Sequence, residues 1–158
     1  MVYTLLQTQL LVGVAVMKIR RMREHDLEFA LDCVRTEGWS GETEQVFRGF
    51  LDVDPEGCSI AEVAGNAVGM CVAISYGQVG FVGELIVLEE FRGRGFGRKL
   101  MQHSVDHLQH RGCRSICLDG DAPAIALYEK LGFVHVCKSL RFVGMMARRE
   151  LFNVRPMV

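Results

Sequence analysis

The chain has 158 residues, which suits one domain with a sizeable hydrophobic core. Hydrophobic residues make up 49% and charged residues 23%, an ordinary balance for a globular protein. The formal net charge of −1 argues against bulk binding to nucleic acid or to acidic membranes, so we expect neither as a partner.

The six cysteines are scattered and form no Cys-x-x-Cys pair. We interpret them as small buried hydrophobic residues in a reducing, cytoplasmic environment. A zinc site built on Cys113 and Cys117 would need further ligands at suitable spacing, and the sequence offers none. Three histidines share one face of a predicted helix and are interpreted as a solvated face, with no metal expected: His103, His107 and His110.

The first segment, residues 1–16, is apolar but too short to span a bilayer comfortably, and polar residues interrupt it. No positively charged region precedes it, so we expect an N-terminal extension and not a signal peptide. An interface strand or helix in this segment is the alternative. We expect the folded domain over residues 17–149 and a C-terminal tail over 150–158.

Hydrophobic periodicity and turn residues then predict a mixed α/β domain, with a central sheet covered by helices. The predicted strands cover about 16–22, 58–64, 67–76, 81–88, 115–119, 134–141 and 142–147. The predicted helices cover about 26–36, 42–51, 97–111 and 121–130.

The most informative segment joins the strand at 81–88 to the next helix. It reads Arg92-Gly93-Arg94-Gly95-Phe96-Gly97. Alternating glycines leave backbone N–H groups uncovered at the positive end of a helix, which favours binding of a phosphate or pyrophosphate, and Arg98 adds charge there. The spacing does not fit the dinucleotide-binding G-x-G-x-x-G pattern, and the hydroxyl residue of a P-loop is absent.

A second motif follows in the predicted helix at 121–130. Residues 124–133 read AIALYEKLGF. Together the two motifs and the order of elements resemble the GNAT superfamily of N-acetyltransferases over most of the chain. The resemblance implies a central, mixed, mostly antiparallel, twisted sheet of about seven strands flanked by about four helices. It also implies transfer of an acetyl group from acetyl-CoA to a primary amine, of a small molecule or a protein, by direct attack in a ternary complex.

Carried over residue by residue, the resemblance implies cofactor contacts from the strand, the loop and the second motif. These residues are Ile86, Val87, Leu88, Arg92, Gly93, Arg94, Gly95, Phe96, Gly97, Arg98, Asp121 and Tyr128. Backbone around Ile86–Leu88 would bind the pantetheine arm and the oxyanion, which requires the sheet to splay there, at a bulge. Tyr128 would protonate the coenzyme A sulfur, with packing on its helix as the alternative. Asp121 stands where many members of the family have an asparagine, and a carboxylate lacks the donor of that amide.

The acceptor side is less defined by the sequence. Glu84 lies two residues before Ile86, so we expect both on one face, with Glu84 as general base or as a solvated or ion-paired strand residue. Asp119 could act as base or orient the amine, or else cap the following helix. Glu37 and Trp39 lie in the loop that covers acceptors in this fold, and core packing is the alternative for Trp39.

A second class of function stays open at this point. The same fold could serve as a non-catalytic acyl-CoA-binding sensor or interaction module. No residue is well placed as an acyl carrier, since the nearest candidate, Cys117, is expected in a strand core. Homodimerisation, the identity of the acceptor and the choice of general base are not decided by the sequence.

Overall fold

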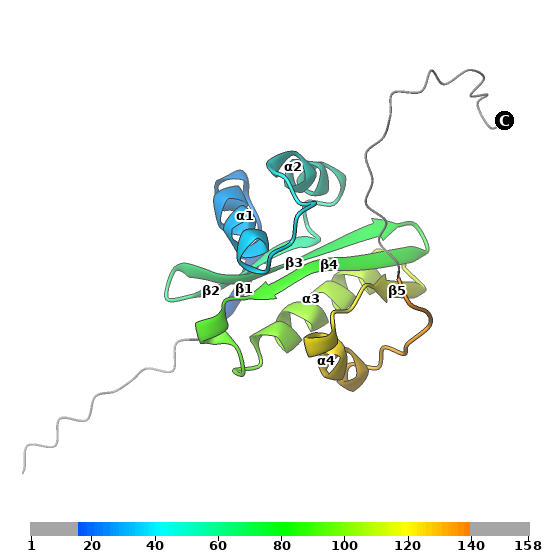
Figure 1. Cartoon of the computed structure of the whole chain (residues 1–158). Coiled ribbons are helices and arrows are strands. Elements are labelled where there is room, and N and C mark those ends of the chain that lie inside the picture. Colours follow the sequence, from blue (N-terminus) through cyan, green and yellow to red (C-terminus); the bar gives the residue numbers. More distant parts are fainter. Residues whose placement is uncertain (1–15, 140–158) are drawn as a thin grey trace, which may run out of the picture.

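Five strands form one sheet at the centre of the protein, in a computed structural model that describes residues 16–139 (Figure 1). Their order across the sheet is β1-β2-β3-β4-β5, and each pair is antiparallel except β4 with β5, which is parallel. The strands are β1 (Lys18–Arg21), β2 (Cys58–Val63), β3 (Asn66–Tyr76), β4 (Val79–Val87) and β5 (Ser115–Leu118).

Four α-helices cover the two faces of this sheet. α1 and α2 lie on one face and α3 and α4 on the other (Figure 1). Their bounds are α1 (Leu27–Thr36), α2 (Glu44–Val53), α3 (Phe96–His110) and α4 (Ile125–Lys130). Short 3₁₀ turns precede α1, the loop before α3, and α4. Thr43 begins α2 as a side-chain cap, because its hydroxyl accepts the backbone N–H of Val46.

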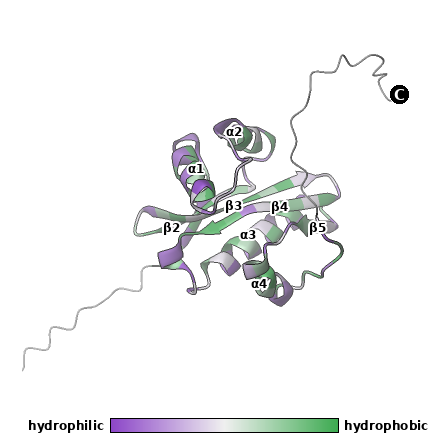
Figure 2. Cartoon of the chain, in the orientation of Figure 1, coloured by the Kyte–Doolittle hydropathy of each residue, from purple (hydrophilic) through white to green (hydrophobic). Residues whose placement is uncertain are grey.

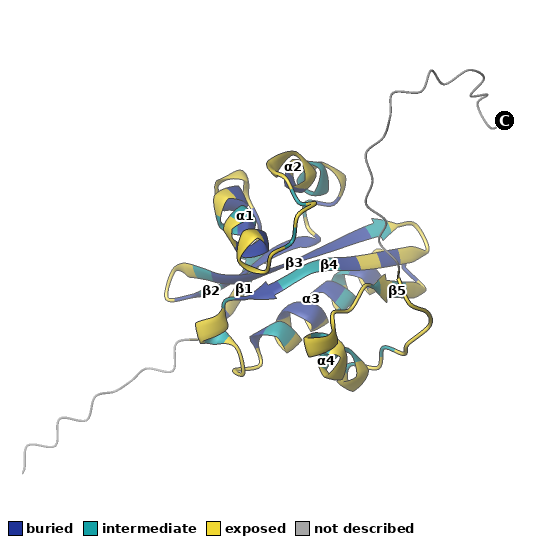
Figure 3. Cartoon of the chain, viewed as in Figure 1, coloured by how far each residue is buried: buried dark blue, intermediate teal, exposed yellow. Residues whose placement is uncertain are grey.

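The sheet separates two apolar cores. On β3, Met70 and Val72 face the core under α1 and α2, whereas Cys71 and Ala73 face the core under α3. Hydrophobic residues follow β3 and β4 through the middle of the molecule (Figure 2), and β2 and β3 are the most deeply buried strands (Figure 3). The alternation of a strand with both faces covered explains this pattern.

The predicted mixed α/β class and mostly antiparallel sheet are confirmed, with boundaries within about three residues for most elements. The strand predicted over 134–141 is wrong for residues 134–139, which are exposed and form no regular element. Residues 140–141 and the strand predicted over 142–147 lie outside the described residues, which accounts for five strands against about seven expected.

The cysteine prediction holds for Cys33, Cys58, Cys71 and Cys113, which are buried free thiols. Cys117 and Cys137 are exposed, so the prediction of burial is wrong for both, as is the expectation that Cys117 lies in a strand core. Cys117 pairs in register with Phe81, which is itself 37% exposed. In the described part of the protein, α1 and α2 leave this corner of the sheet uncovered (Figure 3).

The histidine face of α3 is solvated only in part. His103 and His110 are exposed, but the His107 side chain is 14% exposed and its Nε2 lies 3.1 and 3.2 Å from the two carboxylate oxygens of Asp54. Asp54 is buried between α2 and β2 and also accepts the backbone N–H of Ser75. The pair therefore ties α3 to the turn that follows α2, because a buried carboxylate needs such partners.

Two kinds of feature are absent from the described residues, a membrane-spanning helix and a metal-binding cluster. Among residues 16–139, no helix has both the length and the apolar character needed to cross a bilayer. In the same range, no three His, Cys, Asp or Glu side chains are arranged to hold a metal ion.

We expect His107→Ala to lower the free energy of unfolding by about 2 kcal/mol, because it leaves the buried Asp54 carboxylate short of a partner. Urea denaturation at neutral pH measures this loss. His110→Ala, at an exposed position on the same helix, is the control and should change the value by less than about 0.5 kcal/mol. Equal effects of the two substitutions would contradict a structural role for the pair.

Candidate active site

The candidate site begins where β4 and β5 part. The two strands pair in register only from Val79 with Ser115 to Val82 with Leu118. β5 then ends, while β4 continues to Val87. Within residues 16–139, the second half of β4 therefore has a strand neighbour only on its β3 side, and its other edge opens toward α4 (Figure 1). An open backbone edge inside a covered sheet is a place for an extended ligand to pair.

A β-bulge lies at the same point of β4. Met70 is opposite Ile86 and Val72 is opposite Gly83, so the single residue between them on β3 faces two on β4, Glu84 and Leu85. Glu84 has φ +50°, a left-handed conformation that costs an L-residue about 1–2 kcal/mol. The bulge that the resemblance implied is thus present, just before the expected stretch.

The bulge reverses the alternation of side chains along β4. Ile86 packs in the core under α1 and α2, whereas Leu85 packs in the core under α3. Cys71 lies in that α3 core, and the negative charge of Glu84 contributes to the raised pKa of the Cys71 thiol. Oε2 of Glu84 is buried. The expectation that Glu84 and Ile86 share a face is therefore wrong, because the extra residue shifts the pattern by one.

The backbone groups of β4 divide between β3 and the opening. The N–H of Leu88 donates to the carbonyl of Val68 on β3, at 2.9 Å. By the alternation of an antiparallel ladder, the backbone of Ile86 faces β3 in the same way, and Val87 directs its N–H and C=O groups toward the opening. Of the three residues predicted there, Val87 therefore has the orientation needed to bind a ligand through its backbone.

The glycine loop lies at the end of β4 and begins α3. Gly93 and Gly95 have φ of +73° and +79°, and Gly95 stands at the cap position of the helix. Side chains added at either position would meet open space, so backbone conformation and not crowding requires glycine there. Phe96 is buried and stacks on Phe91, which anchors the loop on its inner side. The first N–H groups of a helix have no intrahelical partner, and those at the start of α3, with the loop glycines, make up the segment predicted to bind a phosphate, which we call the anion cradle.

The arginines of the loop have partners within the protein. Nε of Arg92 donates to the carbonyl of Val87 at 2.8 Å, and its guanidinium pairs with Glu37 in the loop after α1. Arg94 lies over the ring of Phe91, 5.2 Å from its centroid, and donates to the carbonyl of Glu90. Partners within the protein thus reduce the repulsion that Arg92 and Arg94 would otherwise exert on each other.

Tyr128 on α4 lies beside the opening. Its ring packs against Gly120, where a methyl group would come within 2.9 Å of the ring, and it meets Phe133 edge to face. Burial, with smaller effects of Cys71 and Asp121, raises the pKa of Tyr128. The phenol is consequently protonated at neutral pH. Leu127 reaches the first turn of α3, close to Gly97, so the two sequence motifs meet in space.

The remaining predicted residues surround the opening less closely. Trp39 is partly buried and packs on the core under α1 and α2, in agreement with the core alternative. Asp119 is exposed, and the residue at the cap of the turn before α4 is Asp121, whose carbonyl accepts the N–H of Ala124. The capping alternative for Asp119 is therefore wrong.

Cys71 and Ser104 lie next to the bulge, and neither is among the residues predicted for the site. The hydroxyl of Ser104, on α3, donates to the sulfur of Cys71 at 3.2 Å, and both residues are buried. The available signal was a serine on the apolar face of a helix, next to Leu100, Met101 and Leu108.

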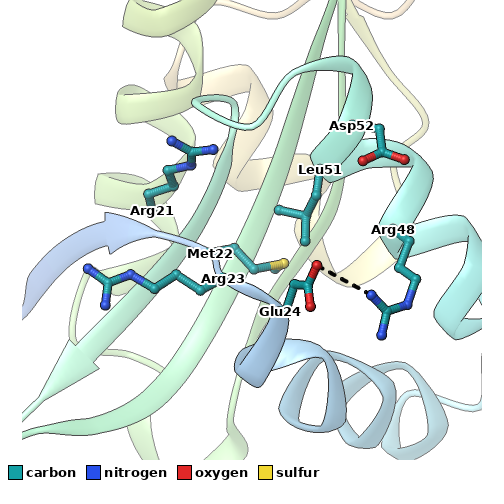
Figure 4. A pocket seen from close by; sticks show the side chains of 7 residues that line it. All are labelled: Arg21, Met22, Arg23, Glu24, Arg48, Leu51 and Asp52. Atoms are coloured by element: carbon teal, nitrogen blue, oxygen red, sulfur yellow. Dashed lines mark ion pairs between the residues drawn. The ribbon is translucent and has the colours of Figure 1, made fainter.

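A hollow of about 510 Å³ lies elsewhere, at the β1 edge of the sheet (Figure 4). Its walls come from the end of β1, the turn before α1, and α2, and they include Arg21, Arg23, Glu24, Arg48 and Asp52. Arg48 and Glu24 form an ion pair across it, at 3.5 Å. It is three strands from β4 and contains none of the predicted site residues, so it is not the candidate active site.

A bulged strand that leaves its neighbour, followed by a glycine loop at a helix N-terminus, defines a class of protein built to bind an extended, phosphate-bearing cosubstrate. The sequence profile of the acetyltransferase (GNAT) family matches residues 19–133. The chain belongs to this family. It is accordingly an acyltransferase, which transfers an acetyl group from acetyl-CoA to an amine.

Individual relatives agree with this assignment. An acetyltransferase of Yersinia enterocolitica is 33% identical over 125 residues, which cover 74% of this chain and 87% of that protein. The N-alpha-acetyltransferase MAK3 of Arabidopsis thaliana is 28% identical over 145 residues, covering 85% and 76%. The crystal structure of Ard1 from Thermoplasma volcanium superposes with a TM-score of 0.71 at 26% identity, covering 77% of this chain and 84% of that one.

We expect Gly95→Ala to weaken binding of coenzyme A at least about tenfold, because an L-residue strains the left-handed conformation and shifts the amides of the cradle. Isothermal titration calorimetry measures the affinity. Gly65→Ala is the matched control, since Gly65 has φ +85° in the turn between β2 and β3 and also has open space around it. Unchanged affinity in Gly95→Ala would contradict the cradle.

Proposed function

We propose that the opening beside β4 binds acetyl-CoA and a primary amine together, and that the amine attacks the thioester directly. One observation carries the proposal: the bulged second half of β4, which has no strand on its α4 side within residues 16–139, runs into the glycine loop at the start of α3. The edge suits a pantetheine arm and the loop a pyrophosphate. Bound there, acetyl-CoA would supply an activated acetyl group to the acceptor.

The proposed contacts divide along the ligand. Gly93, Gly95 and Gly97 offer the loop amides, with Arg98 exposed beside them. Val87 offers a backbone N–H to the thioester oxygen, where negative charge develops during attack. Asp121 lies close enough to Tyr128 to contribute to the raised pKa of the phenol, and we propose that Asp121 contacts the coenzyme A arm.

Tyr128 is the proposed general acid. Its raised pKa keeps the phenol protonated well beyond neutral pH, as a donor to a leaving thiolate requires. Glu84 is the proposed general base, since the bulge holds its carboxylate partly buried at the parting of β4 and β5. The two groups are thus placed on β4 and α4, on either side of the opening.

The acceptor is proposed to approach from the side of the loop after α1. Glu37 has its carboxylate at that side and Trp39 packs beneath the loop, while Asp119 offers an exposed carboxylate after β5; such carboxylates suit a cationic amine. A peptide α-amine is the first acceptor to test, because its pKa of about 8 makes deprotonation easier than for a lysine amine at about 10.4. The name of the Arabidopsis relative supports the same choice.

Further assignments follow from the sequence and are likewise proposals. The catalytic domain covers residues 17–149, with an extension before it and a tail over 150–158. A cytoplasmic location is supported by the four buried free thiols. Homodimerisation is a proposal that sedimentation of the full chain would decide.

The test of the function is thiol release from acetyl-CoA in the presence of an amine panel that includes short peptides, lysine and small-molecule amines. Thiol release above hydrolysis with at least one amine, and a matching acetylated product by mass spectrometry, are expected. A shift in melting temperature with coenzyme A but not with ATP or NAD is the accompanying binding test. Coenzyme A binding without turnover for any amine would favour the non-catalytic alternative.

We expect Tyr128→Phe to lower kcat about a hundredfold while KM for acetyl-CoA changes little, because only the departing thiolate needs the proton. In the unchanged protein, deprotonation of Tyr128 should not lower kcat below about pH 10, since burial moves the pKa of Tyr128 upward from that value. Tyr76→Phe is the control, at an exposed position next to the turn between β3 and β4. Equal rates for Tyr128→Phe and Tyr76→Phe would contradict the acid role.

We expect Glu84→Gln to lower kcat/KM for the amine at least about tenfold at neutral pH, because the amide cannot accept the ammonium proton. The deficit should shrink as the pH approaches the pKa of the amine, where the free base is already abundant. Glu89→Gln, exposed in the turn after β4, is the control. A deficit that stays constant across the pH range would argue for a structural role of Glu84.

A further inference from the structure

A short polar chain crosses the core under α3 and ends at the bulge. The hydroxyl of Ser104 donates to the sulfur of Cys71 at 3.2 Å, and that sulfur lies 3.7 Å from the carbonyl of Gly83. Cys71 and Ser104 are at most 1% exposed. Both are surrounded by apolar side chains of α3, β3 and β4, where a polar group is retained only with partners.

Cys71 occupies the one position of β3 that faces the bulge. It is the single residue opposite Glu84 and Leu85, and Gly83, whose carbonyl it meets, directly precedes Glu84. On its other side, its own carbonyl accepts the hydroxyl of Ser59 on β2. Hydrogen bonds therefore fix both the sulfur of Cys71, through Ser104 on α3, and its backbone carbonyl, through Ser59 on β2.

The direction of these hydrogen bonds requires a protonated thiol. Burial raises the pKa of Cys71 to about 12, so the thiol is neutral at physiological pH and can donate its hydrogen to Gly83 while it accepts from Ser104. A left-handed, non-glycine residue such as Glu84 persists only when its surroundings hold it. The hydrogen bonds from Ser104 to Cys71 and from Cys71 to Gly83 supply such support from the side of α3.

We infer that Cys71 and Ser104 are positioning residues for acetyl transfer: they hold the bulge of β4, and with it the carboxylate of Glu84 and the backbone N–H of Val87, in the arrangement that the reaction needs. The inference rests on the proposed function, in which Glu84 is the base. The two residues are additional to those proposed to contact the substrates, and both are buried in the core under α3.

The kinetic test compares Cys71→Ala and Ser104→Ala with Cys58→Ala, all in the full chain. Cys58 is the matched control, because it is a fully buried thiol whose sulfur lies 3.5 Å from a backbone carbonyl, that of Asp54, but on the opposite face of the sheet. We expect the first two variants to lose roughly tenfold in kcat, since small displacements of catalytic groups are costly, with KM for acetyl-CoA within about twofold. Cys58→Ala should keep kcat.

Cys71→Ser keeps a donor and an acceptor at the same position and should recover most of the kcat lost in Cys71→Ala. A purely structural role would instead lower stability in all alanine variants alike, with no difference in kcat between Cys71→Ala and Cys58→Ala. That result would overturn the inference.

Hydrogen exchange separates this inference from the proposed function. The amide of Ile86 faces β3 directly beside the bulge, so loosening of the bulge should raise its exchange rate about tenfold in Cys71→Ala and Ser104→Ala relative to Cys58→Ala. NMR measures this rate without any substrate. If no amine is acetylated by the unchanged protein, the proposed function fails, and the exchange rates alone decide whether Cys71 and Ser104 hold the bulge. Equal rates in the three variants would overturn the inference.

Discussion

One extra residue in β4 is the constraint on which the rest of the site depends. With Glu84 and Leu85 opposite the single residue Cys71, the strand bends and its alternation shifts. β5 pairs with β4 only before this point, up to Val82. Had the ladder continued without the bulge, the backbone groups of Val87 would have met a neighbouring strand. The N–H of Val87 instead faces the opening, where we propose that it binds the thioester oxygen, and its carbonyl accepts Nε of Arg92.

α3 holds the two ends of the opening in a fixed relation. Its first turn contains the glycine loop, and Leu127 of α4 packs close to Gly97 in that turn. Two turns further on, Ser104 donates a hydrogen bond to Cys71, the residue of β3 opposite the bulge. α3 thus connects the segments proposed to bind the phosphate and the sulfur of coenzyme A with the bulge that holds the proposed base, and all three depend on the packing of the same core.

The parts of this arrangement that could be predicted from the sequence are those set by local pattern. The glycine loop, the start of α3 and the order of elements each follow from spacing within about twenty residues. The side of the sheet that Glu84 faces could not be predicted, because it depends on the register between β3 and β4. The pairing of His107 with Asp54 likewise joins residues far apart in sequence, and periodicity carries no information about such a contact.

The contact between Arg92 and Glu37 has a consequence for how the two substrates are bound. Arg92 follows β4 and donates to Val87, and its guanidinium also pairs with Glu37 in the loop after α1. The loop proposed to cover the amine is therefore connected to the strand proposed to bind the thioester, through one side chain. The ion pair is partly exposed and contributes little to stability. Its effect lies in orientation: a fork of donors on Arg92 fixes Glu37 relative to Val87, so the amine side and the thioester side are set by the same short segment.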